Sequence, residues 1–119
     1  MPGKFAVCRF SADAPVPGWA WSGAFTSVTR TADELSIVCA ADRVPEEDQP
    51  KSPWVCFKLE GPFSFSEVGI LASVIGPLAG SGVPIFAVST FDTDYVLVNE
   101  EHAGIALRAL RDAGHQLLS

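Results

Sequence analysis

Basic residues are scarce in this sequence, and no segment concentrates them. The 119 residues include 8 lysines and arginines against 14 aspartates and glutamates, so the formal net charge is −6. Arg108 and Arg111 are the one close basic pair. Proteins that bind nucleic acid need clustered positive charge to neutralise phosphates. The composition therefore predicts that this protein does not bind nucleic acid.

Charged residues of both signs are also few. They make up 18% of the chain, below the roughly 25% of an average domain, while hydrophobic residues make up 48%. The chain is thus able to build a real interior, either in one compact unit or in two very small ones that share a core. A small, apolar and sparsely charged chain often buries further surface against a partner, and we expect a homodimer.

The sequence lacks a long uninterrupted hydrophobic run. The longest apolar segment, residues 68–88, is broken by Gly76, Pro77, Gly80, Gly82 and Pro84. It cannot form a membrane-spanning helix. Residues 1–10 become polar too quickly for a signal peptide. We therefore expect a cytoplasmic protein that does not bind a membrane.

Residues that typically carry catalysis or bind metals are sparse and scattered. The three cysteines have no C-x-x-C spacing, which argues against a disulfide framework or a zinc site and favours buried thiols. His102 and His115 are well separated in the sequence, without a neighbouring cysteine or suitably spaced carboxylate. No glycine-rich phosphate loop or nucleophile elbow is present. We expect neither a cofactor nor a metal, and we do not expect an enzyme.

The hydrophobic pattern predicts a mixed α+β fold. Strands are expected over residues 5–10, 25–30, 35–40, 54–59, 85–91 and 95–98, with a further short strand over 116–118. A first helix is expected after a cap at Ser64 or Ser66 and through Ala79, and a last helix is expected to be capped by Asn99 and ended by Gly114. Pro77 should kink or end the first helix unless its final turn loosens. A Pro- and Gly-rich loop over residues 11–23 and a charged linker over residues 42–53 separate these elements.

The two halves of the chain show a weak internal repeat. VTRTADELSIV aligns with VSTFDTDYVLV when Val28 is placed over Val88. The strands expected over residues 5–10 and 54–59 precede these aligned segments and correspond to each other. The simplest description is two βαββαβ units, of which the first has lost its long helix to the loop over residues 11–23. We therefore expect a degenerate half over residues 1–53 and a complete domain over residues 54–119, packed as one compact unit.

Two polar clusters within residues 61–99 have the chemistry to hold both ends of a free amino acid. The backbone N–H groups of residues 67–70 open a helix, where unpaired donors and the helix dipole favour a carboxylate. Gly69 would let a ligand approach the backbone closely. The other cluster is formed by the side chains of Thr90, Asp92, Thr93 and Asp94, and the Asp94 carboxylate could accept hydrogen bonds from an ammonium group.

Each of these groups also has a purely structural interpretation. Ser64 and Glu67 fit a helix capping box, although Glu67 could instead reach a basic ligand side chain. Gly69 would also allow close packing of the helix against a strand. Asp92 and the residues beside it are common in turns, where they form local hydrogen bonds. We expect the nearby aromatic residues Phe86, Phe91 and Tyr95 to lie in the core or an interface rather than stack on a ligand.

The segment GPFSFSEVGILASVIGPLAGSGVPIFAVSTFDTDYVLV resembles the second half of small bacterial ACT-domain proteins. These are similar to the cytosolic arginine sensors of animals and to the regulatory part of aspartate kinases. ELSIVCA followed by a VP turn, in the first half, is typical of the same family. The resemblance implies a tandem ferredoxin-like fold, an α+β arrangement of antiparallel sheets with helices on one face. It also implies that an amino acid binds at an interface between ACT units.

In the arginine sensors the ligand lies against the helix entrance after the first strand and against the second and third strands. Transferred position by position, the resemblance implies a ligand site formed by Glu67, Val68, Gly69, Ile70, Thr90, Phe91, Thr93 and Asp94. The sensor site also uses a facing ACT unit. The stripped first half departs from that pattern, so a second chain is expected to complete the pocket.

The leading hypothesis is a non-catalytic regulatory or sensor module that binds a small molecule, expected to be an amino acid, and passes a signal to another protein. The alternative is a structural or protein-interaction module that keeps the ACT fold without a ligand. A small enzyme of ferredoxin-like fold is a third class, disfavoured by the absence of catalytic groups.

Overall fold

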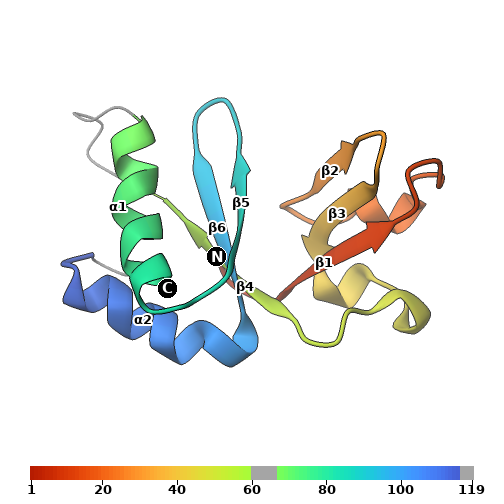
Figure 1. Cartoon of the computed structure of the whole chain (residues 1–119). Coiled ribbons are helices and arrows are strands. Elements are labelled where there is room, and N and C mark those ends of the chain that lie inside the picture. The colour runs from red at the N-terminus through yellow and green to blue at the C-terminus, as the bar shows by residue number, and fades with distance from the viewer. Residues whose placement is uncertain (60–66, 116–119) are drawn as a thin grey trace. The chain divides into compact units, whose positions relative to one another are not determined.

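A computed structural model describes residues 1–59 and 67–115, without the side chains of residues 67–70. The chain forms two compact units (Figure 1). The N-terminal unit is Gly3–Trp54, and the C-terminal unit joins Met1–Pro2 to the chain from Val55 onward. The predicted strand over residues 116–118 and the capping box at Ser64 lie outside the described residues.

The N-terminal unit contains three antiparallel strands, with β3 between β2 and β1. Its elements are β1 (Phe5–Phe10), η1 (Gly18–Trp21), β2 (Ser27–Arg30), β3 (Leu35–Ala40), η2 (Ala41–Arg43) and η3 (Glu46–Asp48), where η denotes a short 3₁₀ helix. The bounds of β1 and β3 are as predicted. β2 starts later than predicted, at Ser27 rather than Phe25.

One face of these strands carries the core of the N-terminal unit. Alternating residues of β3, namely Leu35, Ile37 and Cys39, are fully buried together with Ala6 of β1. The unit has no long helix to cover this face. The loop between β1 and β2 covers it instead, through the partly buried side chains of Ala14, Val16 and Trp19.

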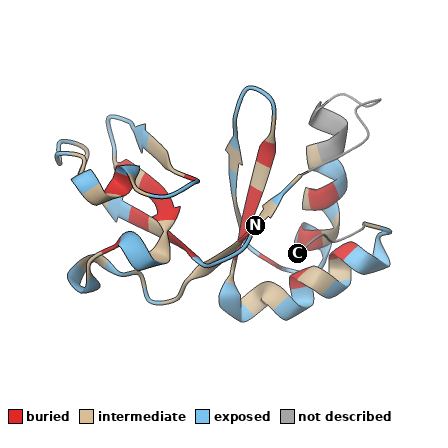
Figure 2. Cartoon of the chain, turned by 180° about the vertical axis from the view of Figure 1, so that it is seen from behind, coloured by how far each residue is buried: buried red, intermediate tan, exposed pale blue. Residues whose placement is uncertain are grey.

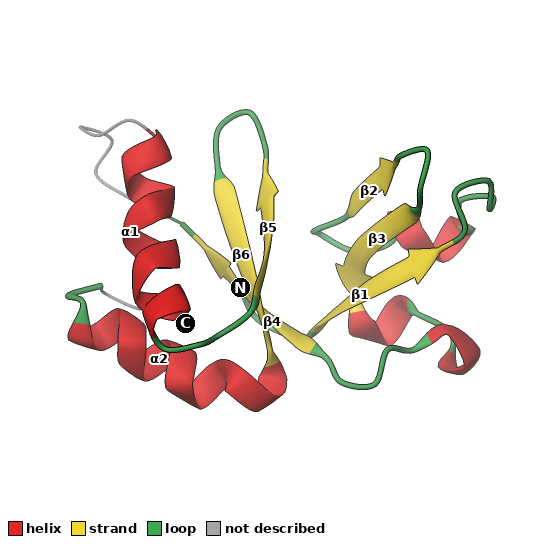
Figure 3. Ribbon diagram, viewed as in Figure 1, coloured by secondary structure: helices red, strands yellow, loops and turns green. Residues whose placement is uncertain are grey.

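The C-terminal unit combines three strands with two α-helices (Figure 3). Strand β6 lies between β4 and β5, and β5 and β6 are antiparallel. The elements are β4 (Trp54–Lys58), α1 (Glu67–Gly80), β5 (Ile85–Ser89), β6 (Asp94–Asn99), η4 (Glu100–His102) and α2 (Ala103–Asp112). The predicted α+β class is therefore observed. β5 ends at Ser89, earlier than predicted, and β6 begins at Asp94 rather than Tyr95.

Both helices pack on the same face of these strands. Val96 and Val98 of β6 form a buried cluster with Val74 and Leu78 of α1, and the cluster includes α2 through Leu110. Figure 2 shows the buried positions gathered along β6 and on the two helices. Because side chains alternate between the two faces of a strand, the residues of β6 that face the helices are Val96, Val98 and those an even number of positions from them.

The end of α1 follows its sequence signals, whereas α2 begins later than its signal predicts. Pro77 lies inside α1, which nevertheless continues to Gly80 before the chain turns at Gly82, where φ is +73°. The Asn99 side chain accepts a hydrogen bond from the Glu101 N–H at 3.1 Å, as expected of a cap. Asn99 caps the short η4 turn that leads into α2, rather than α2 itself.

The hairpins of the two units correspond closely in structure. The Thr31 N–H donates to the Glu34 carbonyl at 2.9 Å, and the Thr90 N–H donates to the Thr93 carbonyl at 2.8 Å. β3 and β6 show the same succession of buried and partly buried positions, and a 3₁₀ turn follows each. The turn hydrogen bonds therefore match Thr31 with Thr90.

The predicted alignment, which places Thr31 over Phe91, is therefore wrong by one position. Both strands of each hairpin are rich in apolar residues, so their letters align almost equally well in neighbouring registers. The hydrogen bonds of the turn, which a comparison of letters does not include, fix the register. In the corrected alignment of the two units, Leu35 is the residue equivalent to Asp94.

Within the part of the chain that the structure describes, neither helix is long and apolar enough to cross a membrane.

Candidate functional site

Asp94 occupies an unusual position for a charged residue. Among the described residues it is the one polar or charged side chain that is buried, with 8% of its surface exposed. It shares a strand face with Val96 and Val98, which pack against the helices. Its own carbonyl accepts a hydrogen bond from the Leu59 N–H at 2.9 Å, at the end of β4. The carboxylate therefore lies on the helix-covered face, at the end of β6 nearest the exit of β4.

The Asp94 carboxylate has a cross-strand partner in Ser89. The two residues are directly paired in the β5–β6 register, and the Ser89 hydroxyl donates to Oδ1 of Asp94 at 2.5 Å. Ser89 is exposed, whereas the Asp94 side chain paired with it is buried. An ionised carboxylate accepts hydrogen bonds through both of its oxygens, so Oδ2 could accept a further one.

Ser89 was not among the predicted site residues. A serine at the end of a strand is ordinary, so residue type alone gave no signal. The register would have identified it, because a four-residue turn over residues 90–93 places Ser89 opposite Asp94.

The other predicted residues of the hairpin lie in the turn itself. The Thr90 hydroxyl accepts from the Thr93 N–H at 3.2 Å and lies 3.0 Å from the Thr93 carbonyl. Such local hydrogen bonds are expected if these residues stabilise the turn rather than bind a ligand. Phe91 projects at the tip with 96% of its surface exposed, so it is not part of the core of the chain.

The predicted backbone donors lie at the start of α1. The helix begins at Glu67, so Glu67, Val68, Gly69 and Ile70 form its first turn. Their N–H groups have no acceptor within the helix. This turn and the β5–β6 turn lie at the same end of the C-terminal unit, at the top of Figure 1. The structure thus brings both predicted clusters to one end of the unit, with donors from the helix and a carboxylate from β6.

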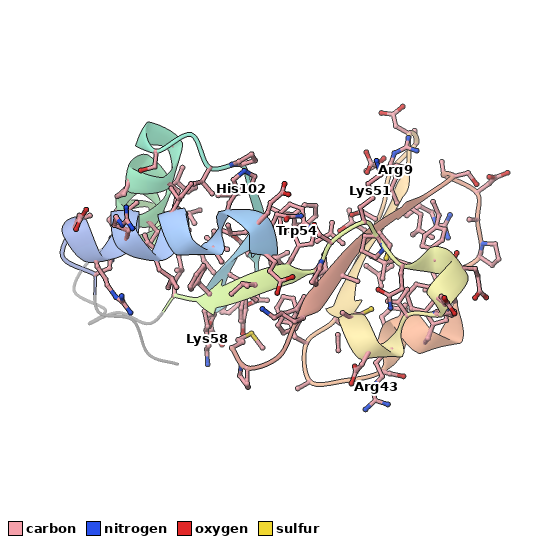
Figure 4. The ribbon with its side chains drawn as sticks, turned by 90° about the horizontal axis from the view of Figure 1, so that it is seen from below. Arg9, Arg43, Lys51, Trp54, Lys58 and His102 are labelled. Carbon is pink, nitrogen blue, oxygen red and sulfur yellow. The ribbon has the colours of Figure 1, made fainter. Side chains whose placement is uncertain are left out.

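No described cationic side chain forms an ion pair with the Asp94 carboxylate. Lys58 is the basic residue next to Leu59, which is hydrogen-bonded to Asp94, but its side chain points away from the helices (Figure 4). Leu59, by contrast, packs into the helix-covered cluster. Since burying a carboxylate without a cationic partner costs free energy, the site is suited to receive a positive group from outside.

Among the described residues, the remaining cysteine and histidine side chains show no arrangement suited to metal binding or catalysis. Within the described residues, no group of three or more histidine, cysteine or acidic side chains could hold a metal ion. Burial raises the pKa of the Cys8 and Cys56 thiols to about 11, and it also raises the pKa of Cys39, so these thiols are poor nucleophiles. The Nδ1 atom of His102 is buried and has no hydrogen-bond partner among the described residues.

Two solved structures resemble this fold. A crystal structure of a protein from Agobacterium tumefaciens is 49% identical, with a TM-score of 0.87, and the match covers 98% of this chain and 87% of that one. A protein of unknown function from Vibrio cholerae, described as a possible transport protein, has a TM-score of 0.72. That match covers 97% of this chain and 87% of the other, but at 19% identity it supports the fold alone.

The chain is also similar to curated proteins from animals. The cytosolic arginine sensor for mTORC1 subunit 1 of Homo sapiens is 36% identical over 59 residues, and the mouse protein matches equally well. This match covers 49% of the chain but only 18% of the sensor.

Two family models match the sequence in succession. One describes an N-terminal domain and matches residues 3–47. The other is the ACT domain and matches residues 50–112, more than half of the chain and nearly all of the described C-terminal unit. The resemblance expected from the sequence is thereby confirmed, and the chain belongs to the ACT domain family.

Proposed function

We propose that this protein is a non-catalytic regulatory module whose C-terminal unit binds a free amino acid. The observation that carries the proposal is the buried Asp94 carboxylate, with no described cationic partner, at the same end of the unit as the first turn of α1. A zwitterion presents an ammonium group and a carboxylate together. Asp94 would accept the ammonium group, and the N–H groups of residues 67–70 would donate to the carboxylate.

The sequence similarity supports the same class of ligand. The curated relatives are named as arginine sensors, and the matched segment is a small part of their length. In the proposed site, Thr90, Phe91 and Thr93 form the rim beside Asp94. Glu67, whose side chain lies outside the described part of the structure, is proposed as the partner of a basic ligand side chain. The relatives are also cytosolic by name, which supports a cytoplasmic location for this module.

The proposal includes a duplicated architecture and a pocket completed by a second chain. The shared strand order, turn hydrogen bonds and burial pattern of the two units support descent from one repeated ACT unit, with residues 1–53 as the degenerate half. The fully exposed Phe91 ring at the tip of the hairpin is available to a second copy of the chain. A monomeric mass by light scattering, with and without amino acids, would contradict the two-chain pocket.

A thermal-shift screen against the twenty standard amino acids tests the main proposal. A ligand at about 100 times its Kd adds roughly 2.7 kcal/mol of stability, which is readily seen as a higher Tm. Asp94→Asn, which keeps the shape and removes the charge, should abolish the shift. Asp112→Asn, at an exposed acid at the end of α2, is the matched control and should keep it. If no amino acid at millimolar concentration raises the Tm, the chain is better described as a structural or interaction module.

A further inference from the structure

We infer that each chain holds a single amino-acid site, because the N-terminal unit fills the matching place with its own residues 11–21. This inference rests on the proposed function of the C-terminal unit. It concerns the number and position of the sites in the chain. Two hairpins of the same construction would otherwise suggest two sites.

The first step is the identity of the paired residues at the base of each hairpin. In the C-terminal unit this pair is Ser89 and Asp94, which share a hydrogen bond. At the matching positions of the N-terminal unit the pair is Arg30 and Leu35. The turn hydrogen bonds that follow each pair are equivalent, so the comparison is position for position.

The second step is the chemistry of Leu35. Its side chain is fully buried, with 0% of its surface exposed. An apolar side chain offers no acceptor to an ammonium group, and placing a charge against it would cost free energy that nothing repays. The position that supplies the acceptor in one unit therefore excludes a cation in the other.

The strand face that carries Leu35 is covered differently from the face that carries Asp94. In the C-terminal unit, the face of β6 that carries Asp94 is bordered by helices, and Ser89 beside it is open to solvent. In the N-terminal unit, the same face of β3 is covered by Ala14, Val16 and Trp19 from the loop between β1 and β2. The loop packs directly against the cluster that contains Leu35, so it occupies the place a ligand would need.

Arg30 fixes the loop between β1 and β2 in place through hydrogen bonds. The Arg30 guanidinium donates to the carbonyl oxygens of Ala12 and Ala14, and the bond to Ala14 measures 2.6 Å. Arg30 stands at the position matched by Ser89. Where the C-terminal unit has a hydroxyl that orients a carboxylate, the N-terminal unit has a cation that fixes its own covering segment.

Isothermal titration calorimetry with each of the twenty standard L-amino acids, on the full chain, tests the inference. We expect one amino acid molecule per chain for the wild type, and none for Asp94→Leu, which copies the residue of the N-terminal unit. Asp94→Asn serves as a second variant if Asp94→Leu does not fold by circular dichroism. Asp112→Asn, at an exposed acid at the end of α2, should still bind one molecule.

A stoichiometry other than one per chain would overturn the inference alone. Binding that persists in Asp94→Leu or Asp94→Asn would overturn the inference and also contradict the role of Asp94 in the proposed function. If the wild type binds none of the twenty amino acids, the proposed function itself fails and this inference fails with it. The two failures are therefore distinguishable in the same set of titrations.

Discussion

The Nε2 atom of His115 lies 2.8 Å from the carbonyl oxygen of Ser73, one helical turn before Pro77. In a regular α-helix the N–H of the residue at the proline position would donate to this carbonyl, but proline has no N–H. Pro77 cannot donate to the Ser73 carbonyl, so His115, which follows α2, supplies a hydrogen-bond donor in its place. This contact joins the end of the α2 segment to α1, the two helices that cover β6.

A double-mutant cycle should show that His115 and Pro77 are coupled. His115→Ala should lower the unfolding free energy of the C-terminal unit by about 1 kcal/mol, the value of a typical hydrogen bond. In a Pro77→Ala background the cost should be smaller, because the new alanine can donate its own N–H to the Ser73 carbonyl. Urea unfolding followed at 222 nm measures this unit, since both α-helices belong to it. Equal costs in both backgrounds would refute the coupling.

Asp94→Leu should preserve or raise stability while it removes ligand binding. Leu35 shows that leucine fits the matching strand position with complete burial. The substitution removes a carboxylate that is shielded from water and adds apolar burial, so we expect a gain of about 1–2 kcal/mol in the unfolding free energy. Urea unfolding of the ligand-free variant measures this difference.

Asp94→Ala is the matched control for that experiment. It also removes the charge and the hydrogen bond to Ser89, but it buries little apolar surface, so its stability should fall below that of Asp94→Leu. A loss of more than about 1 kcal/mol in Asp94→Leu would mean that the Ser89–Asp94 pair stabilises the fold rather than serving a ligand.

The strands and the helix start were accessible from the sequence because their causes are local. β1 and β3 match their predicted bounds, since alternating buried residues define them. α1 begins at Glu67, within the range that the sequence signals allowed. These features depend on the residues within one segment, so a single sequence is enough to find them.

The pairing across the hairpin was less accessible because it depends on register. The β5–β6 register moved Asp94 from a turn into a strand, and it made Ser89 its partner. The turn hydrogen bonds also shifted the match between the units by one position, so that Thr31 corresponds to Thr90. A register is a relation between two segments, and apolar residues on both strands make neighbouring registers look alike.

Arg30→Ala should loosen the segment that covers the N-terminal unit. The segment carries its own backbone hydrogen bonds, including that from the Ala20 N–H to the Pro17 carbonyl at 3.1 Å. Without the guanidinium, peptides from residues 11–22 should exchange amide hydrogen about tenfold faster, as expected for the loss of roughly 1.4 kcal/mol of local stability. Hydrogen exchange with mass spectrometry measures this rate.

Arg43→Ala is the control for Arg30. Arg43 extends away from the ribbon (Figure 4), and its neighbour Asp42 is 3.8 Å away at the surface. Such an exposed pair contributes little, so exchange over residues 11–22 should stay at the wild-type rate. Arg30→Lys should not restore protection fully, because an ammonium group lacks the fork that reaches two carbonyls. Unchanged exchange in Arg30→Ala would show that packing alone holds the segment.

Cys56 should make the stability of the C-terminal unit fall above pH 9. Burial raises the pKa of this thiol from 9.0 to about 11 in the folded state. Between these values the folded chain keeps the proton that the unfolded chain loses, so the unfolding free energy decreases as the pH rises. The contribution of the Cys56 thiol to the unfolding free energy is complete below pH 9 and is lost progressively toward pH 11.

Comparison of variants isolates this contribution from other groups that titrate in the same range. The slope of unfolding free energy against pH, from urea curves at 222 nm between pH 9 and 10.5, should be shallower in Cys56→Ala than in the wild type by up to about 1.4 kcal/mol per pH unit. Cys8→Ala removes a thiol of similar pKa from the N-terminal unit, and it should leave this slope unchanged. Identical slopes in all three proteins would mean that the Cys56 thiol reaches water and titrates as it does in the unfolded chain.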